Sequence, residues 1–187
     1  MEGNLFEKTV SSEQIFKGKI LTLFYDKVEL PNGIIATREK VGHPGAVAVV
    51  PVNDRKEVVL VKQYRHPIEK VLIEIPAGKL ESGESALKCA ERELHEEAGV
   101  VNGKLTHLIT IYTSPGFSDE KMDIFIATEF EEKENNPDHD EFLHIFKAGI
   151  NECLKMIEDG QILDAKSIIG IMLARDYLLK KENEHNK

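Results

Sequence analysis

The side chains best suited to chemistry are glutamates gathered between positions 78 and 100, in the stretch GKLESGESALKCAERELHEEAGV. Successive residues of a helix turn by about 100°, which places Glu93 and Glu97 on one face, beside the apolar Ala90. Two carboxylates at this spacing repel each other, and a position at the margin of a core makes the repulsion worse. A divalent cation relieves both penalties, and hard oxygen ligands of this kind suit Mg²⁺ or Mn²⁺.

A helix must position these carboxylates, and the sequence marks where it begins and ends. Ser82 is the expected N-cap, and Gly99 is the expected residue just past the last turn. Between them, the spacing predicts one apolar stripe that faces a core, formed by Leu87, Ala90, Leu94 and Ala98.

The length and charge of the whole chain limit the classes of protein it can be. Its 187 residues suit one domain with a full hydrophobic core. The net charge of −9 argues against a nucleic-acid or anionic-membrane surface as partner. The net charge does not exclude a small anionic substrate, provided that a metal supplies local positive charge.

The cysteines and the N-terminal residues indicate the cellular compartment in which the protein is expected. Cys89 and Cys153 are the only cysteines, and no CxxC pair occurs, so we expect buried reduced thiols and a cytoplasmic protein. The N-terminal residues lack the basic and apolar regions of a signal peptide. No apolar run approaches the roughly 18 residues that a membrane span needs.

The pattern along the chain predicts a mixed sheet flanked by helices. Residues 1–13 are polar and are expected to be loosely held, whereas Asn32-Gly33 between two alternating runs predicts an antiparallel hairpin. Further strands are expected at 45–50, 57–63, 71–75, 104–113, 122–129 and 142–146, and helices at 150–157 and from Asp164, as the N-cap, to Leu179. Residues 131–141 read as an acidic loop, and the last residues, KKENEHNK, as a frayed tail.

The acidic segment resembles the Nudix box without a mismatch. That pattern is Gly, five residues, Glu, seven residues, then Arg-Glu-aliphatic-any-Glu-Glu-any-Gly-aliphatic. The matching positions are Gly78, Glu84, Arg92, Glu93, Leu94, Glu96, Glu97, Gly99 and Val100. Three further segments and the N-terminal hairpin are similar to the ADP-ribose pyrophosphatase branch of the family: VVLVKQYRHPIEKVLIEIPAGKLESGE, YTSPGFSDE and DAKSIIGIMLARDYL.

The resemblance implies an α/β (α+β) fold, a Nudix-type α/β/α sandwich with a mixed sheet, plus an N-terminal antiparallel β-hairpin. One Nudix hydrolase domain then spans 1–187, with the hairpin at about 14–40 and the catalytic core at 41–180. The implied activity is metal-dependent hydrolysis of the pyrophosphate bond of ADP-ribose to AMP and ribose 5-phosphate, with Mg²⁺ or Mn²⁺. Two alternatives stay open: another nucleoside diphosphate sugar or dinucleotide, such as GDP-mannose, or a non-catalytic module that senses ADP-ribose.

The resemblance also assigns roles within the box. Glu93 and Glu97 are the implied metal ligands, joined by Glu96, directly or through water, and by the backbone carbonyl of Ala77. Arg92 is implied to hold the catalytic carboxylates by charge pairing, and its planar fork suits bidentate pairing with carboxylates. Glu84 is implied to support the box.

A further carboxylate on a movable loop is needed to accept the proton of the attacking water. In relatives, the acidic loop before a strand carries such a base, and Asp138, Asp140 and Glu141 occupy the matching stretch. We favour Asp140 or Glu141 over Asp138, with Glu120 as the rival candidate.

Substrate contacts are expected from four segments. Arg38 and Arg65 are candidates for contacts to phosphate or to the terminal ribose, and Glu74 either bonds a sugar hydroxyl or pairs with Arg65. The resemblance implies that the turn of Ser114 and Gly116 shapes the ribose end, together with Glu120. In this branch the N-terminal strands often cross to a partner subunit, which implies a homodimer.

Overall fold

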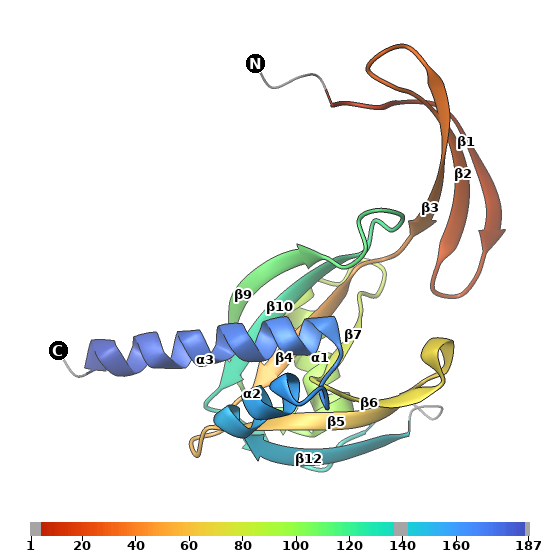
Figure 1. Ribbon diagram of the computed structural model, residues 1–187. Helices are drawn as coiled ribbons and strands as arrows, with labels where there is room; N and C mark the ends of the chain where they lie inside the picture. The colour runs from red at the N-terminus through yellow and green to blue at the C-terminus, as the bar shows by residue number, and fades with distance from the viewer. Residues whose placement is uncertain (1–4, 137–141, 186–187) are drawn as a thin grey trace. The chain divides into compact units, whose positions relative to one another are not determined.

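The computed structural model describes residues 5–136 and 142–185 (Figure 1). The chain divides into two compact units, of which the first comprises residues 1–45 and 112–121 and the second comprises 46–111 and 122–187. The first unit contains three strands: β1 (Lys8–Lys17), β2 (Thr22–Glu29) and β3 (Ile35–Gly42).

Apart from the single residues Tyr112 and Lys121, the second unit holds the remaining elements. Its helices are α1 (Ala86–Ala98), α2 (Ile150–Glu158), α3 (Ala165–His185) and the short 3₁₀ helix η1 (His66–Ile68). Its strands are β4 (Ala46–Pro51), β5 (Glu57–Arg65), β6 (Lys70–Glu74), β7 (Ala77–Lys79), β8 (Val100–Val101), β9 (Lys104–Tyr112), β10 (Lys121–Thr128), β11 (Glu131–Glu132) and β12 (Leu143–Gly149).

The first unit is an antiparallel sheet in the order β1-β2-β3. The hairpin expected around Asn32-Gly33 is confirmed: Gly33 has a φ of +82° and donates its N–H to the carbonyl of Leu30 at 2.8 Å. The expectation that residues 1–13 are loosely held is wrong from Lys8 onward, because β1 pairs with β2. All ten β1 residues are exposed. The sequence KTVSSEQIFK does not alternate between apolar and polar residues, which is the pattern that would have indicated a half-buried strand.

Strand β4 lies at the centre of the second unit, in the sheet order β7-β4-β10-β9. It pairs in parallel with β10 and antiparallel with β7, so the sheet is mixed, as predicted. Val47 and Val49 point to the α1 side and share a core with Leu94, whereas Ala48 and Val50 point to the α3 side. Figure 1 shows α3 and α1 on opposite sides of this sheet. A strand buried on both faces explains the unbroken apolar run.

A second sheet, β12-β5-β6, is antiparallel throughout and contributes β5 to both cores. Helix α3 approaches β4 closely at Gly170, where an added Cβ would lie 2.9 Å from Val50 Cγ2 and 2.9 Å from Ile75 Cδ1. The lack of a side chain at Gly170 therefore sets how near the start of α3 comes to the end of β6. The layered α/β/α fold class expected from the sequence is confirmed.

Helix α3 begins where the sequence predicts and continues further. The Asp164 carboxylate accepts the backbone N–H of Ser167 at 3.0 Å, which is an N-cap bond. The expected frayed tail after Leu179 is wrong, because the helix extends to His185. Lys and Glu are good helix formers and no Gly or Pro interrupts the run. No helix in the described ranges is long and apolar enough to cross a membrane.

Candidate active site

Helix α1 is capped one turn later than the sequence suggests. The expectation of Ser82 as N-cap is wrong: the Oγ atom of Ser85 accepts the N–H of Lys88 at 3.4 Å. Gly83, with a φ of +81°, bends the chain into a turn just before the helix and prevents an earlier start. The predicted C-terminal end is confirmed, since Gly99 adopts a φ of +64° and its N–H bonds to the carbonyl of His95.

One face of α1 packs against the sheet and carries the two glutamates with it. Ala90 and Leu94 are buried as predicted, but Leu87 is 47% exposed because it lies in the first turn, ahead of the packed turns. Glu93 and Glu97 are 8% and 2% exposed, at the margin of the core where the helical wheel places them.

The backbone of β7 lies directly against both carboxylates. Glu97 Oε2 accepts the N–H of Ala77 at 2.8 Å. An added Cβ at Gly78 would lie 1.8 Å from Glu93 Oε1, so the glutamate occupies the space that any side chain would fill. The carboxylates are thus held by a strand that tolerates no side chain at this point.

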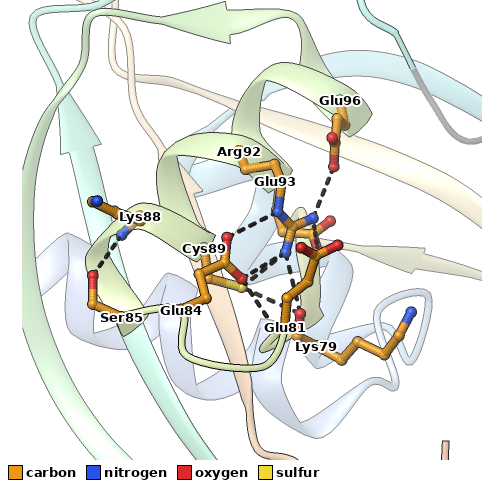
Figure 2. Close-up of polar contacts among 9 residues, drawn as sticks. All are labelled: Lys79, Glu81, Glu84, Ser85, Lys88, Cys89, Arg92, Glu93 and Glu96. Atoms are coloured by element: carbon orange, nitrogen blue, oxygen red, sulfur yellow. Dashed lines mark hydrogen bonds and ion pairs between the residues drawn. The ribbon is translucent and has the colours of Figure 1, made fainter.

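Arg92 is the centre of an ionic network beside the helix, as Figure 2 shows. Its guanidinium donates to both oxygens of Glu84 at 3.0 Å and to Glu93 Oε1 at 2.7 Å. It also donates to Glu96 Oε2 at 2.9 Å and to the carbonyl of Lys79 at 3.2 Å. The box is therefore tied together by one guanidinium that uses its full set of donors.

These contacts fix the charges of the network. The hydrogen bonds from Arg92 lower the pKa of Glu84 to about 2, and the bond to Glu84 raises the pKa of Arg92 further above its ordinary value. Burial, followed by its contact with Glu84, raises the pKa of the Cys89 thiol to about 12. Arg92 and Glu84 are consequently charged at neutral pH, while the thiol beside them is not.

The donor set suits a hard divalent cation. Glu93 and Glu97 supply two buried carboxylates, and Glu96 and the carbonyl of Ala77 lie on the neighbouring turn and strand. In the part of the chain that is described, no three His, Cys, Asp or Glu side chains are already gathered as a metal centre. Arg92 Nη1 bonds to both Glu93 and Glu96, so these two carboxylates are paired with a guanidinium.

A second ionic cluster in the same unit contains Arg65 and Glu74. Arg65 donates from Nε and Nη2 to the two oxygens of Glu74, at 2.7 and 2.6 Å. Glu74 is only 1% exposed and is also bonded by Lys166. Burial raises the pKa of Glu74, but the bonds and charges of Arg65 and Lys166 outweigh it and hold the pKa below its ordinary value. The Glu74 bond, and more weakly the charge of Glu97, raise the pKa of Arg65.

Sequence reasoning found the pairing of Arg65 with Glu74 as one alternative and missed Lys166. The only local signal for Lys166 was its place in the run Asp164-Ala165-Lys166-Ser167 at a helix start. Its partner Glu74 is far away in the sequence, so the contact was not predictable from spacing.

The other predicted substrate residues lie in the first unit. Arg38 forms two bonds with Glu7, at 3.0 and 2.6 Å, and borders a hollow of about 330 Å³ that Gly116 also lines. Ser114 accepts two backbone N–H groups through its carbonyl, at 3.1 and 2.9 Å, and so closes the turn that contains Gly116. Glu120 accepts the hydroxyl of Thr113 at 2.6 Å.

The predicted bases have no described position. Asp138, Asp140 and Glu141 lie outside the described residues. Of the candidates for the base, only Glu120 therefore has a described position, and it lies in the first unit.

Comparison with known proteins places these features in a family. A model described as "NUDIX domain" matches residues 42–165, and one described as "Nucleoside diphosphate sugar hydrolase N-terminal domain" matches residues 7–41. An ADP-ribose pyrophosphatase of Bacillus subtilis (strain 168) is 45% identical over 96% of each chain. A methanol dehydrogenase activator of Bacillus methanolicus is also 45% identical, over 90% of this chain and 93% of that protein. The crystal structure of an ADP compounds hydrolase shares the fold, with a TM-score of 0.84 and 24% identity over 95% of this chain and 97% of that one.

Proposed function

The chain belongs to the Nudix family, and on that basis we propose that it hydrolyses the pyrophosphate bond of ADP-ribose to AMP and ribose 5-phosphate. The observation that carries the proposal is the pair of buried carboxylates, Glu93 and Glu97, held against the side-chain-free backbone of β7. An intact acidic pair of this kind has no use in a module that only senses a ligand. The 45% identity to an ADP-ribose pyrophosphatase over 96% of the chain supports the choice of substrate.

Nudix hydrolases generally use divalent metal ions, and we propose Mg²⁺, with Mn²⁺ as a substitute. Glu93 and Glu97 would hold the ion, together with Glu96 and the carbonyl of Ala77. When bound, such an ion neutralises pyrophosphate oxygens and lowers the pKa of a bound water. Arg92 bonds through Nη1 to both Glu93 and Glu96, so its part is to orient these carboxylates.

The remaining roles follow from charge and exposure. Arg65 has a side chain that is 38% exposed and uses Nε and Nη2 for Glu74, which leaves the Nη1 edge to face a phosphate oxygen. Arg38 remains our candidate for a contact to phosphate or to the terminal ribose, and Ser114, Gly116 and Glu120 remain our candidates for the ribose end. The proton of the attacking water is assigned to Asp140 or Glu141, with Glu120 as the rival.

A panel of substrates tests the proposal. Purified protein with Mg²⁺ is offered ADP-ribose, GDP-mannose, NADH, diadenosine polyphosphates and nucleoside triphosphates in separate reactions, and the products are identified by chromatography and ³¹P NMR. ADP-ribose should give the highest kcat/KM, AMP and ribose 5-phosphate should appear in equal amounts, and EDTA should stop the reaction. Equal or better turnover of GDP-mannose would contradict the assignment of ADP-ribose as the substrate, but it would still agree with hydrolysis of a pyrophosphate bond.

A second candidate function comes from the relative named methanol dehydrogenase activator, whose identity to this chain equals that of the pyrophosphatase. The chain would then stimulate a methanol dehydrogenase. Addition of the protein to such a dehydrogenase, with and without Mg²⁺, separates the two: stimulation favours the second function, whereas hydrolysis of ADP-ribose without stimulation favours the first.

The surface of the first unit supports a homodimer. Its sheet exposes large apolar side chains on β1 and at the following turn, including Val10, Ile15, Phe16 and Ile20, each 55% exposed. Exposed apolar surface of this extent marks an interface. Light scattering coupled to gel filtration should give a mass twice that of the 21.1 kDa chain. Replacing Val10 and Ile15 with Lys should lower the measured mass towards that of a single chain. A monomeric wild type would contradict the proposal.

Partners and location complete the proposal. Cys89 and Cys153 are both free and buried, which accords with a reducing, cytoplasmic compartment. The net charge of −9 disfavours a nucleic-acid partner.

A further inference from the structure

We propose that Lys166 is a positioning residue: through the buried carboxylate of Glu74, it keeps Arg65 oriented for an anionic substrate. The inference rests on the proposed function, because it concerns how that substrate is bound. Lys166 lies in the first turn of α3, whereas Arg65 ends β5, so the contact joins a helix and a strand across the fold.

The start of α3 is fixed against the end of β6 by a buried serine. Ser167 is 0% exposed, and its Oγ atom donates to Asp164 at 2.5 Å and accepts the N–H of Ile75 at 2.9 Å. Because Ile75 directly follows Glu74, this bond sets the distance between the helix and the buried carboxylate. Lys166 is thereby brought to Glu74 with its side chain only 11% exposed.

The same segment of backbone leads into the proposed metal site. Ser167 holds the N–H of Ile75, and two residues later the N–H of Ala77 is bonded to Glu97. Arg65 also responds to the charge of Glu97, which contributes to raising its pKa after the larger effect of the Glu74 bond. Arg65 is therefore electrostatically coupled to Glu97, one of the carboxylates proposed to hold the metal ion.

The charges of the cluster explain why a second cation is present. Arg65 alone satisfies Glu74 with two parallel bonds, so the carboxylate does not need Lys166 for neutralisation. Lys166 also lies 3.0 Å from Asp164, so two cations and two carboxylates balance in the cluster. Without Lys166 the cluster carries one net negative charge, and Glu74 loses one of the two cations that bond to it. Arg65 itself stays fully charged, but an anionic substrate would then meet a more negative cluster, in which Glu74, the partner of Arg65, is less firmly held.

The test compares Lys166→Met, Lys166→Arg and Lys180→Met. Lys180 is exposed on the same helix and serves as the matched control. Lys166→Met should raise the KM for ADP-ribose about tenfold while kcat changes less than about threefold, because the loss is one of substrate positioning and charge. Lys166→Arg, which keeps the charge, should restore most of the affinity, and Lys180→Met should behave as wild type.

A binding measurement separates this inference from the proposed function. Calorimetric titrations with ADP-ribose and with inorganic pyrophosphate, each in the presence of EDTA, detect binding without turnover. Lys166→Met should weaken the binding of both ligands about tenfold. That result supports the inference even if the wild type fails to hydrolyse ADP-ribose. A fall in kcat with unchanged KM and Kd, a failure of Lys166→Arg to recover, or a wild type that binds neither probe would overturn it. If Lys166→Met does not fold, Lys166→Gln keeps a hydrogen-bond donor without the charge and carries the same expectation.

Discussion

Replacing Glu97 with Gln is expected to lower kcat for ADP-ribose by about 10²- to 10³-fold, the range seen when one preorganised electrostatic contact is lost. Glutamine has nearly the same size, and its amide oxygen can still accept the N–H of Ala77. The fold should therefore persist, while the negative charge that would hold a divalent ion is gone. Initial rates at saturating Mg²⁺ and substrate measure the change.

The stability of Glu97→Gln distinguishes a metal ligand from a structural carboxylate. Glu97 is 2% exposed and lies one turn from Glu93, so its charge is costly in the absence of a cation. In metal-free buffer the variant should unfold at the same temperature as wild type or higher, and added Mg²⁺ should stabilise it less than wild type.

The exposed Glu91 on the same helix supplies the control, since Glu91→Gln should change neither activity nor the response to Mg²⁺. Electron paramagnetic resonance with Mn²⁺ gives the affinity directly and should show weaker binding in Glu97→Gln alone. Full activity in that variant would remove Glu97 from the metal site.

The sequence predicted the parts of this site that depend on fixed local spacing. The helix, its Gly99 end and the burial of Glu93 and Glu97 follow from residues close together in the chain. The N-cap was misplaced because Ser82 and Ser85 are chemically equivalent caps. Only the left-handed backbone of Gly83, which the sequence does not specify, decides between them.

Two features depend on contacts that no local pattern reveals. Strand β1 has no buried face, so it is formed through backbone pairing with β2, and its sequence does not alternate between apolar and polar residues. Lys166 meets Glu74 at a place where Gly170 allows α3 to approach the sheet closely and where Ser167 bonds to Ile75. Each of these contacts joins residues that are distant in sequence, and single-sequence periodicity cannot register them.

Gly78→Ala is expected to abolish most of the activity through one added methyl group. The Cβ would lie 1.8 Å from Glu93 Oε1 and 1.9 Å from Glu93 Cδ, far inside contact distance. Gly78 does not have a positive φ, so alanine suits the backbone and the effect comes from this overlap alone. Either β7 moves away from α1 or the Glu93 carboxylate turns out of place.

Both responses damage the site by different routes. Movement of β7 would break the bond between the N–H of Ala77 and Glu97, whereas rotation of Glu93 would break its 2.7 Å bond with Arg92. Because a displacement of about 1 Å in a reacting geometry can cost about 10²-fold, we expect at least that loss in kcat/KM. Overpacking should also lower the free energy of unfolding by about 1–3 kcal/mol.

Gly149→Ala is the matched control, since an added Cβ there meets nothing within 4 Å and Gly149 has a φ of −59°. Kinetics with ADP-ribose, Mn²⁺ affinity and urea unfolding are measured on both variants. Gly149→Ala should retain wild-type activity, while Gly78→Ala should lose Mn²⁺ affinity together with activity. If Gly78→Ala lost stability but kept its Mn²⁺ affinity and kcat, the close packing of β7 on Glu93 would serve the fold alone. The requirement for glycine at this position would then not come from the catalytic carboxylates.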